Sequence, residues 1–146
     1  MNILFVCTGN TCRSPMAAAL ADKIIGDACP DIRIESAGIY AQAGMEASEG
    51  AKEALKDYGI DLSYHRSQPL TKDLIDQCDL ILTMTKSQKS ALLPIAGDKV
   101  YTLSEYAGFD TDVSDPYGGN TQVYKETAKQ LYGLIEAVVE KLKNND

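Results

Sequence analysis

A cysteine and an arginine, Cys7 and Arg13, stand six positions apart near the start of the chain. A thiolate is a strong nucleophile, and a planar guanidinium can hold two oxygens of a phosphoryl group at once. Between them lies Thr8-Gly9-Asn10-Thr11-Cys12, and Ser14-Pro15 follows. A curled loop of this kind can bind an anion through its backbone N–H groups, assisted by the positive end of a following helix. The pattern predicts a phosphate-binding loop with Cys7 as nucleophile and Arg13 as the residue that stabilises the transferring phosphoryl group.

Residues inside this segment suit such a loop. Gly9 permits close approach to a ligand and unusual dihedrals, while Asn10 tolerates left-handed backbone conformations and can tie the loop together with its amide. Ser14 can place a hydroxyl beside the sulfur of Cys7. A free cysteine at the end of a strand is most often only a small buried hydrophobe, but the agreement of loop, arginine and helix favours the nucleophile.

A carboxylate far along the chain offers the proton transfer that such a nucleophile requires. Asp115 lies in the only long irregular stretch, which is rich in glycine and aspartate. A leaving group must be protonated as it departs from phosphorus, and an aspartate can supply that proton. Pro116 favours extended backbone at Asp115, and Tyr117 is placed to wall the cleft. Asp110 and Asp112, in the same stretch, are better explained as solvated turn residues.

Strands and helices are expected to alternate along the chain and to position these residues. Apolar runs or alternating patterns predict strands, and apolar residues three and four positions apart predict helices. The expected strands cover residues 3–6, 32–36, 80–82 and 100–103. The expected helices cover residues 16–25, 46–58, 71–77, 87–95 and 124–142.

This alternation predicts an α/β fold, because parallel strands need crossover connections. We expect a four-stranded parallel sheet with helices on both faces, doubly wound in the manner of flavodoxin, in one domain over residues 1–146. Ligands of such sheets bind beyond the carboxyl ends of the strands, so the loop after the first strand is the expected phosphate site. Ser14 is expected to cap the helix that follows, and Gly26 to end it.

The overall composition limits the partners and the setting of such a protein. The chain has 146 residues, with 21 acidic and 14 basic side chains and a formal net charge of −7. This excess of negative charge disfavours nucleic acid and anionic membrane surfaces. The first residues lack a basic segment and a long apolar run, so we expect a cytoplasmic protein. In that reducing setting the four cysteines are expected to be free thiols, and a single histidine gives little support for a metal site.

The first loop resembles the C-x5-R-S signature of the low-molecular-weight protein tyrosine phosphatases. The likeness extends over nearly the whole chain and includes Ser36-Ala37-Gly38, His65 and Asp115-Pro116-Tyr117. It implies two in-line steps: Cys7 takes up the phosphoryl group while Asp115 protonates the leaving group, and water activated by Asp115 then hydrolyses the phosphocysteine. Neither a metal nor a cofactor is implied, since the loop backbone and Arg13 carry the charge stabilisation.

The same resemblance implies supporting roles for further residues. In the family, an asparagine of the loop, a serine after the second strand and a histidine form a buried hydrogen-bonded scaffold, and Asn10, Ser36 and His65 match those positions. A partly exposed loop histidine is the other interpretation of His65. Cys12 matches a second cysteine that can form a reversible disulfide with the nucleophile; the other interpretation is a thiol packed under the loop.

Two features bear on the substrate. Thr11 stands where tyrosine phosphatases of the family usually have a bulky aliphatic residue, and Gly118-Gly119 follows Tyr117 where many have another aromatic. Both Thr11 and Tyr117 are therefore expected to influence specificity. The combination resembles the bacterial protein arginine phosphatases, a branch of this family. It favours phosphoarginine in proteins as the substrate, with phosphotyrosine as the alternative. The other explanation of Thr11 is that its side chain only packs against its neighbours. We expect the protein to act as a monomer.

Other functions fit the sequence less well. Arsenate reductases share this fold and loop but need two further cysteines close together, and Cys78 has no such neighbour, so Cys29 and Cys78 are interpreted as structural. A phosphocysteine carrier would not need Arg13 and Asp115, because it must avoid hydrolysis. A non-catalytic phosphopeptide-binding protein would be expected to lose Cys7 or Asp115.

Overall fold

The computed structural model describes residues 1–144, so the last two residues of the expected domain, 145–146, lie outside the described residues. The strands are β1 (Asn2–Cys7), β2 (Arg33–Gly38), β3 (Leu80–Thr83) and β4 (Val100–Thr102). The helices are α1 (Arg13–Ala28), α2 (Glu49–Lys56), α3 (Lys72–Gln77), α4 (Lys86–Ala96), α5 (Leu103–Ala107) and α6 (Thr121–Asn144), with a 3-10 turn at Gly97–Lys99.

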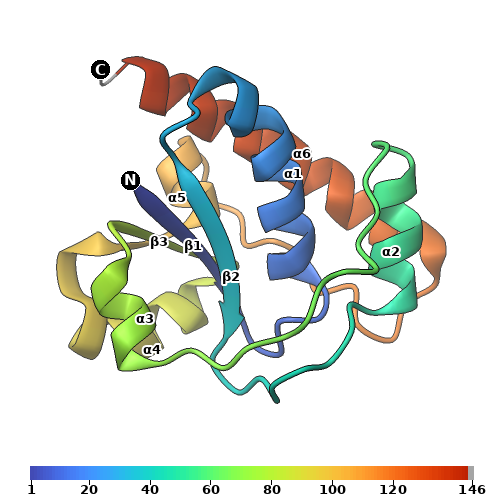
Figure 1. Cartoon of the computed structure of the whole chain (residues 1–146), viewed down its shortest axis with the longest axis horizontal. Coiled ribbons are helices and arrows are strands. Elements are labelled where there is room, and N and C mark those ends of the chain that lie inside the picture. Colours follow the sequence, from blue (N-terminus) through green and yellow to red (C-terminus); the bar gives the residue numbers. More distant parts are fainter. Residues whose placement is uncertain (145–146) are drawn as a thin grey trace.

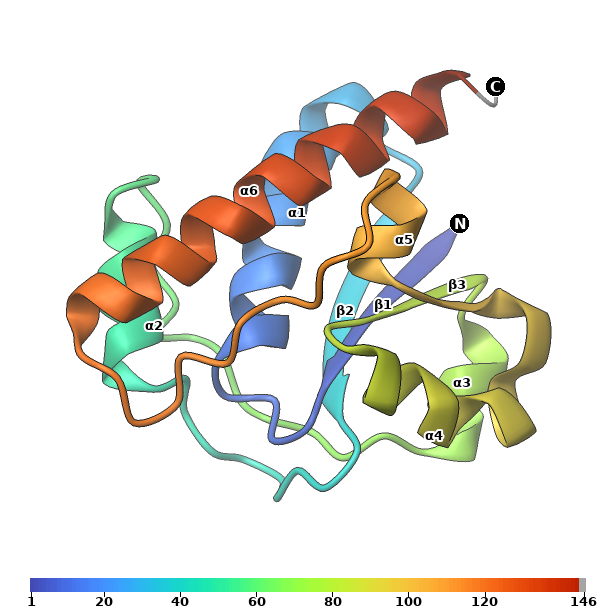
Figure 2. The same cartoon turned by 180° about the vertical axis from the view of Figure 1, so that it is seen from behind.

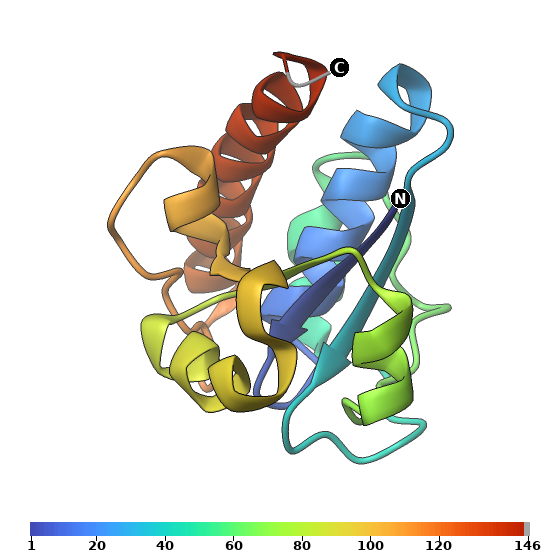
Figure 3. The same cartoon turned by 90° about the vertical axis from the view of Figure 1, so that its left-hand side faces the viewer.

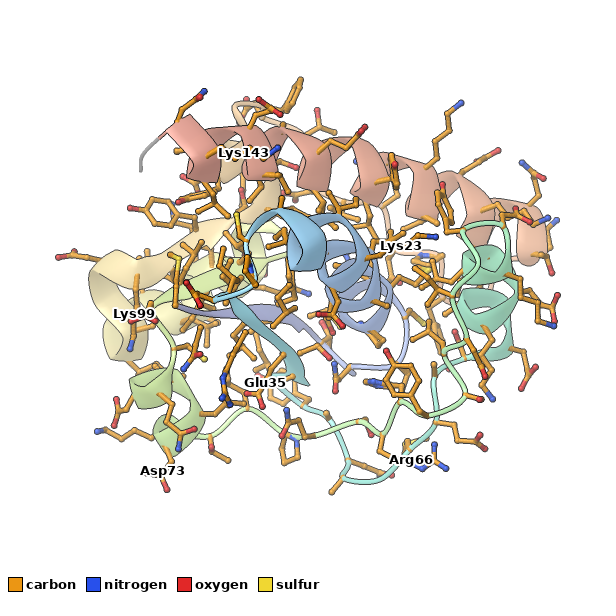
Figure 4. All side chains as sticks on the ribbon, turned by 45° about the horizontal axis from the view of Figure 1, so that its top comes forward. Lys23, Glu35, Arg66, Asp73, Lys99 and Lys143 are labelled. Atoms are coloured by element: carbon orange, nitrogen blue, oxygen red, sulfur yellow. The ribbon has the colours of Figure 1, made fainter. Side chains whose placement is uncertain are left out.

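The four strands form one parallel sheet in the order β2-β1-β3-β4. Helices α1, α2, α5 and α6 lie on one side of the sheet, and α3 and α4 lie on the other (Figures 1 and 3). The prediction of a four-stranded parallel sheet with helices on both faces is confirmed.

Strand β1 is buried on both faces because its side chains alternate between two apolar cores. Ile3, Phe5 and Cys7 belong to the core beneath α1 and α6, while Leu4 and Val6 belong to the core beneath α3 and α4. The connection from β1 leads to one neighbour, β2, and the chain then crosses to the other neighbour, β3. The carboxyl end of β1 is therefore the switch point of the sheet, where α/β folds bind their ligands.

The connection between α5 and α6 runs along the same end of the molecule. Figure 2 shows this segment crossing α1 near the loop that follows β1. Two of the contacts that hold it there involve Val113: its N–H donates to Met84 O at 3.0 Å, and its carbonyl oxygen accepts from Arg13 Nη1 at 3.0 Å. Residues about a hundred positions apart in the sequence are thereby brought to one end of the sheet.

Several element boundaries differ from the prediction. Helix α1 begins at Arg13 with Cys12 at its cap position, so the prediction of Ser14 as the cap is wrong; the Ser14 hydroxyl contacts Cys7 and Asn10 instead. The helix also passes through Gly26 and ends at Ala28, because Pro30 cannot continue it.

Two other helices begin where a hydroxyl side chain caps their N-terminus. Helix α2 begins only at Glu49, because the Ser48 hydroxyl accepts from Ala51 N–H; the segment from residue 46 is therefore not yet helical. Thr102 caps the unpredicted short helix α5, which removes Leu103 from the fourth strand.

Candidate active site

The loop from Cys7 to Arg13 is curled, and several of its backbone N–H groups have no hydrogen-bond acceptor among residues 1–144. The left-handed conformation in this loop falls on Asn10, whose φ is 57°, and not on Gly9. Within the part of the chain that the structure describes, the N–H groups of Gly9, Thr11 and Cys12 have no protein acceptor. Free N–H groups at the start of a helix form an anion site.

Close packing against the neighbouring strand fixes the shape of this loop. A Cβ atom on Gly38, at the end of β2, would lie 2.7 Å from Thr8 O and 2.9 Å from Asn10 N. Only glycine fits there, and Tyr40 N–H then donates to Thr8 O at 3.0 Å. The Ser36-Ala37-Gly38 motif therefore includes a residue whose missing side chain lets β2 approach the phosphate loop.

The sulfur of Cys7 is buried and receives hydrogen bonds from within the loop. Cys7 Sγ lies 2.9 Å from Ser14 Oγ and 3.3 Å from Asn10 N. Asn10 Nδ2 donates to Ser14 Oγ at 2.8 Å, which leaves the proton of the serine hydroxyl free to point at the sulfur. The Ser14 hydroxyl and the Asn10 N–H group therefore both donate to the sulfur.

Asn10 is the centre of a buried network that joins three parts of the chain. Besides Ser14, its Nδ2 donates to Ser36 Oγ at 2.9 Å, and its Oδ1 accepts from Gln68 N–H at 3.0 Å. His65 Nε2 lies 2.8 Å from Asn10 O, and because a carbonyl oxygen only accepts, this nitrogen carries the proton. The structure thus places Asn10, Ser36 and His65 in contact.

The imidazole of His65 is held as a neutral donor. Burial is the largest cause that lowers the pKa of His65, and the charge of Arg66 lowers it further, while the bond to Asn10 O acts in the opposite direction. A neutral ring with a proton on Nε2 supports the loop backbone and adds no charge beside the thiolate.

Arg13 and Asp115 face each other across the site. Arg13 is buried, and its Nη2 lies 3.7 Å from Asp115 Oδ2. The Asp115 side chain is 58% exposed, so it can reach a bound substrate from the open side. Val113, which accepts from Arg13, is almost fully buried and, with the buried Pro116, anchors a loop whose other residues from Asp110 to Asn120 are exposed. The sequence could have indicated this anchor, because Val113 is an apolar residue within an acidic stretch.

A pocket of ≈ 280 Å³ lies between these groups. It is lined by the phosphate loop and the late loop: Cys7, Thr8, Gly9, Thr11, Cys12, Arg13, Asp115 and Tyr117. Tyr117 is 80% exposed at the rim, and its N–H donates to Asp115 Oδ1 at 3.1 Å. Gly118, with φ at 80°, lets the chain turn away behind it, which a second aromatic residue would do only with strain. The pocket has the size and donors for a phosphorylated side chain.

The four cysteines differ sharply in their surroundings. Only Cys7 and Cys12 line the pocket, and all four are free thiols. Cys12 Sγ lies 3.4 Å from Ser48 Oγ and 3.5 Å from Tyr124 Oη, two contacts that the sequence did not predict. Cys29 and Cys78 lie elsewhere, and burial raises the pKa of the Cys78 thiol. This arrangement offers no relay of three cysteines of the kind that an arsenate reductase needs.

Residues 1–144 contain neither a metal-binding cluster nor a helix that could span a membrane. No group of three or more histidine, cysteine or carboxylate side chains is placed to hold a metal ion there. None of the helices in this range has both the length and the hydropathy required to cross a bilayer.

The phosphate-binding loop from Cys7 to Arg13 lies at the switch point of the sheet, and Asp115 faces it. This combination is that of a cysteine-dependent phosphatase. The family model for low molecular weight phosphotyrosine protein phosphatase matches residues 2–146, and the chain belongs to this family.

Similar proteins carry two kinds of name. A protein-arginine-phosphatase of Geobacillus stearothermophilus is 45% identical over 144 residues, covering 96% of this chain and 95% of that protein. A low molecular weight protein-tyrosine-phosphatase, PtpB of Staphylococcus haemolyticus, is 41% identical over 137 residues, covering 92% and 95%.

A solved structure adds a chemical detail. It is a YwlE arginine phosphatase in which serine replaces a cysteine and the active-site serine is phosphorylated; its TM-score is 0.91 at 42% identity, with 98% of this chain and 96% of that chain covered. The predicted fold and enzyme class are thus confirmed.

Proposed function

We propose that this phosphatase hydrolyses phosphoarginine side chains in proteins. The observation that carries the substrate is the position of Thr11, which lines the same pocket as Cys7 and Asp115. A threonine hydroxyl can hydrogen-bond a polar guanidinium, whereas the bulky aliphatic residue expected in a tyrosine phosphatase favours an aromatic ring. The protein-arginine-phosphatase relative at 45% identity supports this choice.

In the proposed first step, the thiolate of Cys7 attacks phosphorus and forms an S–P bond as the P–N bond to the guanidino group breaks. Asp115 gives its proton to the departing nitrogen, which leaves as arginine. Arg13 and the free N–H groups of the loop neutralise charge on the phosphoryl oxygens. The serine of the phosphorylated relative occupies a nucleophile position, which supports the covalent intermediate.

In the second step, the Asp115 carboxylate takes a proton from water, whose oxygen attacks phosphorus. The S–P bond breaks, its electron pair returns to the sulfur, and orthophosphate is released. Ser14 stabilises the sulfur as it leaves, since its hydroxyl lies 2.9 Å away. The scaffold of Asn10, Ser36 and His65 keeps the loop in this geometry.

The partners we propose are phosphorylated proteins, with no part for nucleic acid or membranes. We propose that the protein acts as a monomer, since this chain itself supplies the nucleophile, the arginine and the acid that the two steps use. The four free thiols support a reducing compartment such as the cytoplasm.

The substrate proposal is tested by exchanging Thr11 for isoleucine. We expect Thr11→Ile to shift the ratio of kcat/KM for phosphoarginine over phosphotyrosine, measured on one peptide carrying either residue, by about tenfold or more toward tyrosine. Thr11→Ser keeps the hydroxyl and serves as the control that preserves the wild-type ratio. A wild-type enzyme that prefers phosphotyrosine, or a ratio that Thr11→Ile leaves unchanged, would overturn the proposal.

A further inference from the structure

A buried glutamine connects the phosphate loop to the opposite side of the sheet. Gln88 lies in the first turn of α4 and is 7% exposed. Its Nε2 donates to Thr8 Oγ1 at 3.1 Å. Its Oε1 accepts from the backbone N–H groups of Met84 at 2.9 Å and Thr85 at 3.1 Å. One side chain therefore joins the phosphate loop to the turn between β3 and α4, residues 84–86.

The same turn also holds the loop that carries the acid. Met84 O accepts from Val113 N–H at 3.0 Å, and Lys86 N–H donates to Asp112 Oδ1 at 3.0 Å. These contacts lie two and three residues before Asp115. The turn between β3 and α4 is thus bonded on one side to the loop of the nucleophile and on the other to the loop of the acid.

We propose that Gln88 is a positioning residue that sets the spacing between Cys7 and Asp115. This inference rests on the proposed function, in which both residues must align with phosphorus at once. In-line transfer tolerates little displacement, and an error of about 1 Å can cost about a hundredfold in rate. The Met84 N–H group also lies 3.2 Å from Val6 O, so the position needs an acceptor chiefly for the Thr85 N–H group, together with a donor for the Thr8 hydroxyl, and glutamine supplies both. Methionine offers neither, and glutamate lacks the donor.

Thr8 is held from two sides, which makes its contact with Gln88 consequential. Its carbonyl accepts from Tyr40 on the β2 side, and its hydroxyl accepts from Gln88 on the α4 side. Thr8 directly follows the nucleophile and lines the pocket. Loss of the hydroxyl contact would loosen the first residue of the phosphate loop while leaving the turn and the acid loop bonded to each other.

The test compares two aryl phosphates whose leaving groups differ in their need for a proton. For Gln88→Met we expect kcat/KM on phenyl phosphate to fall about tenfold to a hundredfold, and on 4-nitrophenyl phosphate only a few-fold, since a displaced acid matters least for a good leaving group. Inhibition by orthophosphate is expected to weaken as well. Gln77→Met, at an exposed residue of α3, is the matched control and should match the wild type.

Three further variants test the two contacts one at a time and do not depend on the folding of Gln88→Met. Thr8→Val removes the contact with Gln88 and is expected both to weaken inhibition by orthophosphate and to change the leaving-group dependence in the same direction as Gln88→Met, and Thr8→Ser should restore both. Asp112→Ala, at an exposed residue, removes the bond from Lys86 and is expected to change the leaving-group dependence in the same direction as Gln88→Met.

The outcomes distinguish this inference from the proposed function. The role of Gln88 alone is overturned by either of two results. One is a leaving-group dependence that stays at the wild-type value in both Gln88→Met and Asp112→Ala. The other is an inhibition by orthophosphate that is unchanged in both Gln88→Met and Thr8→Val. A wild-type protein that turns over neither the aryl phosphates nor a phosphoarginine peptide contradicts the proposed function. Because the readouts are the leaving-group dependence on aryl phosphates and the inhibition by orthophosphate, a preference for phosphotyrosine over phosphoarginine would leave the inference intact.

Discussion

Replacing Cys7 with serine is expected to lower kcat/KM on a phosphoarginine peptide by about a thousandfold or more. A serine hydroxyl is a much weaker nucleophile than a thiolate at neutral pH. The side chain remains within reach of the Ser14 hydroxyl and the Asn10 N–H group. The exchange replaces one buried atom by a slightly smaller one, so the melting temperature should change little. Steady-state kinetics and thermal unfolding of the same sample measure both quantities.

A matched control for this variant is Cys29→Ser, because Cys29 lies outside the pocket. It should retain wild-type kinetics. Turnover by Cys7→Ser within a few-fold of the wild type would exclude the covalent route and with it the assignment of Cys7.

Exchanging Asp115 for asparagine is expected to lower kcat/KM on the phosphoarginine peptide by about 10² to 10⁴-fold. Asparagine cannot donate the proton or accept one from water, but its Oδ1 can still accept from Tyr117 N–H. Since the Asp115 side chain is 58% exposed, neither stability nor the affinity for orthophosphate should fall. The wild type and Asp115→Asn are compared by steady-state kinetics, thermal unfolding and inhibition by orthophosphate, all measured on one preparation of each.

Asp110→Asn serves as the control for this loop, because Asp110 is exposed and, among residues 1–144, forms its ion pair with Lys86 at 3.0 Å. It should retain most of the activity. If Asp110→Asn lowered the rate as much as Asp115→Asn, the general acid would not be Asp115, and the interpretation of Asp110 as a solvated turn residue would be wrong.

The fold could be predicted largely because its signals are local. The apolar run of β1 and the stripe of α6, with Leu131, Ile135 and Val138 buried on one side, indicate their elements without knowledge of the partner. The predicted ends of helices are less accurate where a residue that could cap the helix makes a different hydrogen bond instead. Ser14 looks like a helix cap, but its hydroxyl serves the Cys7 sulfur. No periodic pattern distinguishes these uses.

The site could be predicted for residues that are close in sequence or match a family motif, and less well for long-range contacts. Cys7 and Arg13 share one loop, and Asp115 was found from its Asp-Pro-Tyr motif. Gln88 reaches Thr8 across 80 positions, and Tyr124 reaches Cys12 across 112. A glutamine in a helix and a tyrosine on an apolar stripe are ordinary there, so only the tertiary packing shows what they touch.

The covalent phosphocysteine is the central claim, and Asp115→Asn allows its most direct test. With 4-nitrophenyl phosphate the first step needs little help from the acid, while hydrolysis of the intermediate still lacks its base. We predict a rapid burst of nitrophenol close to one equivalent per chain, followed by slow turnover, and peptide mapping of the quenched sample should find phosphate on Cys7. Linear release from the first turnover, with no phosphate on Cys7, would contradict the account.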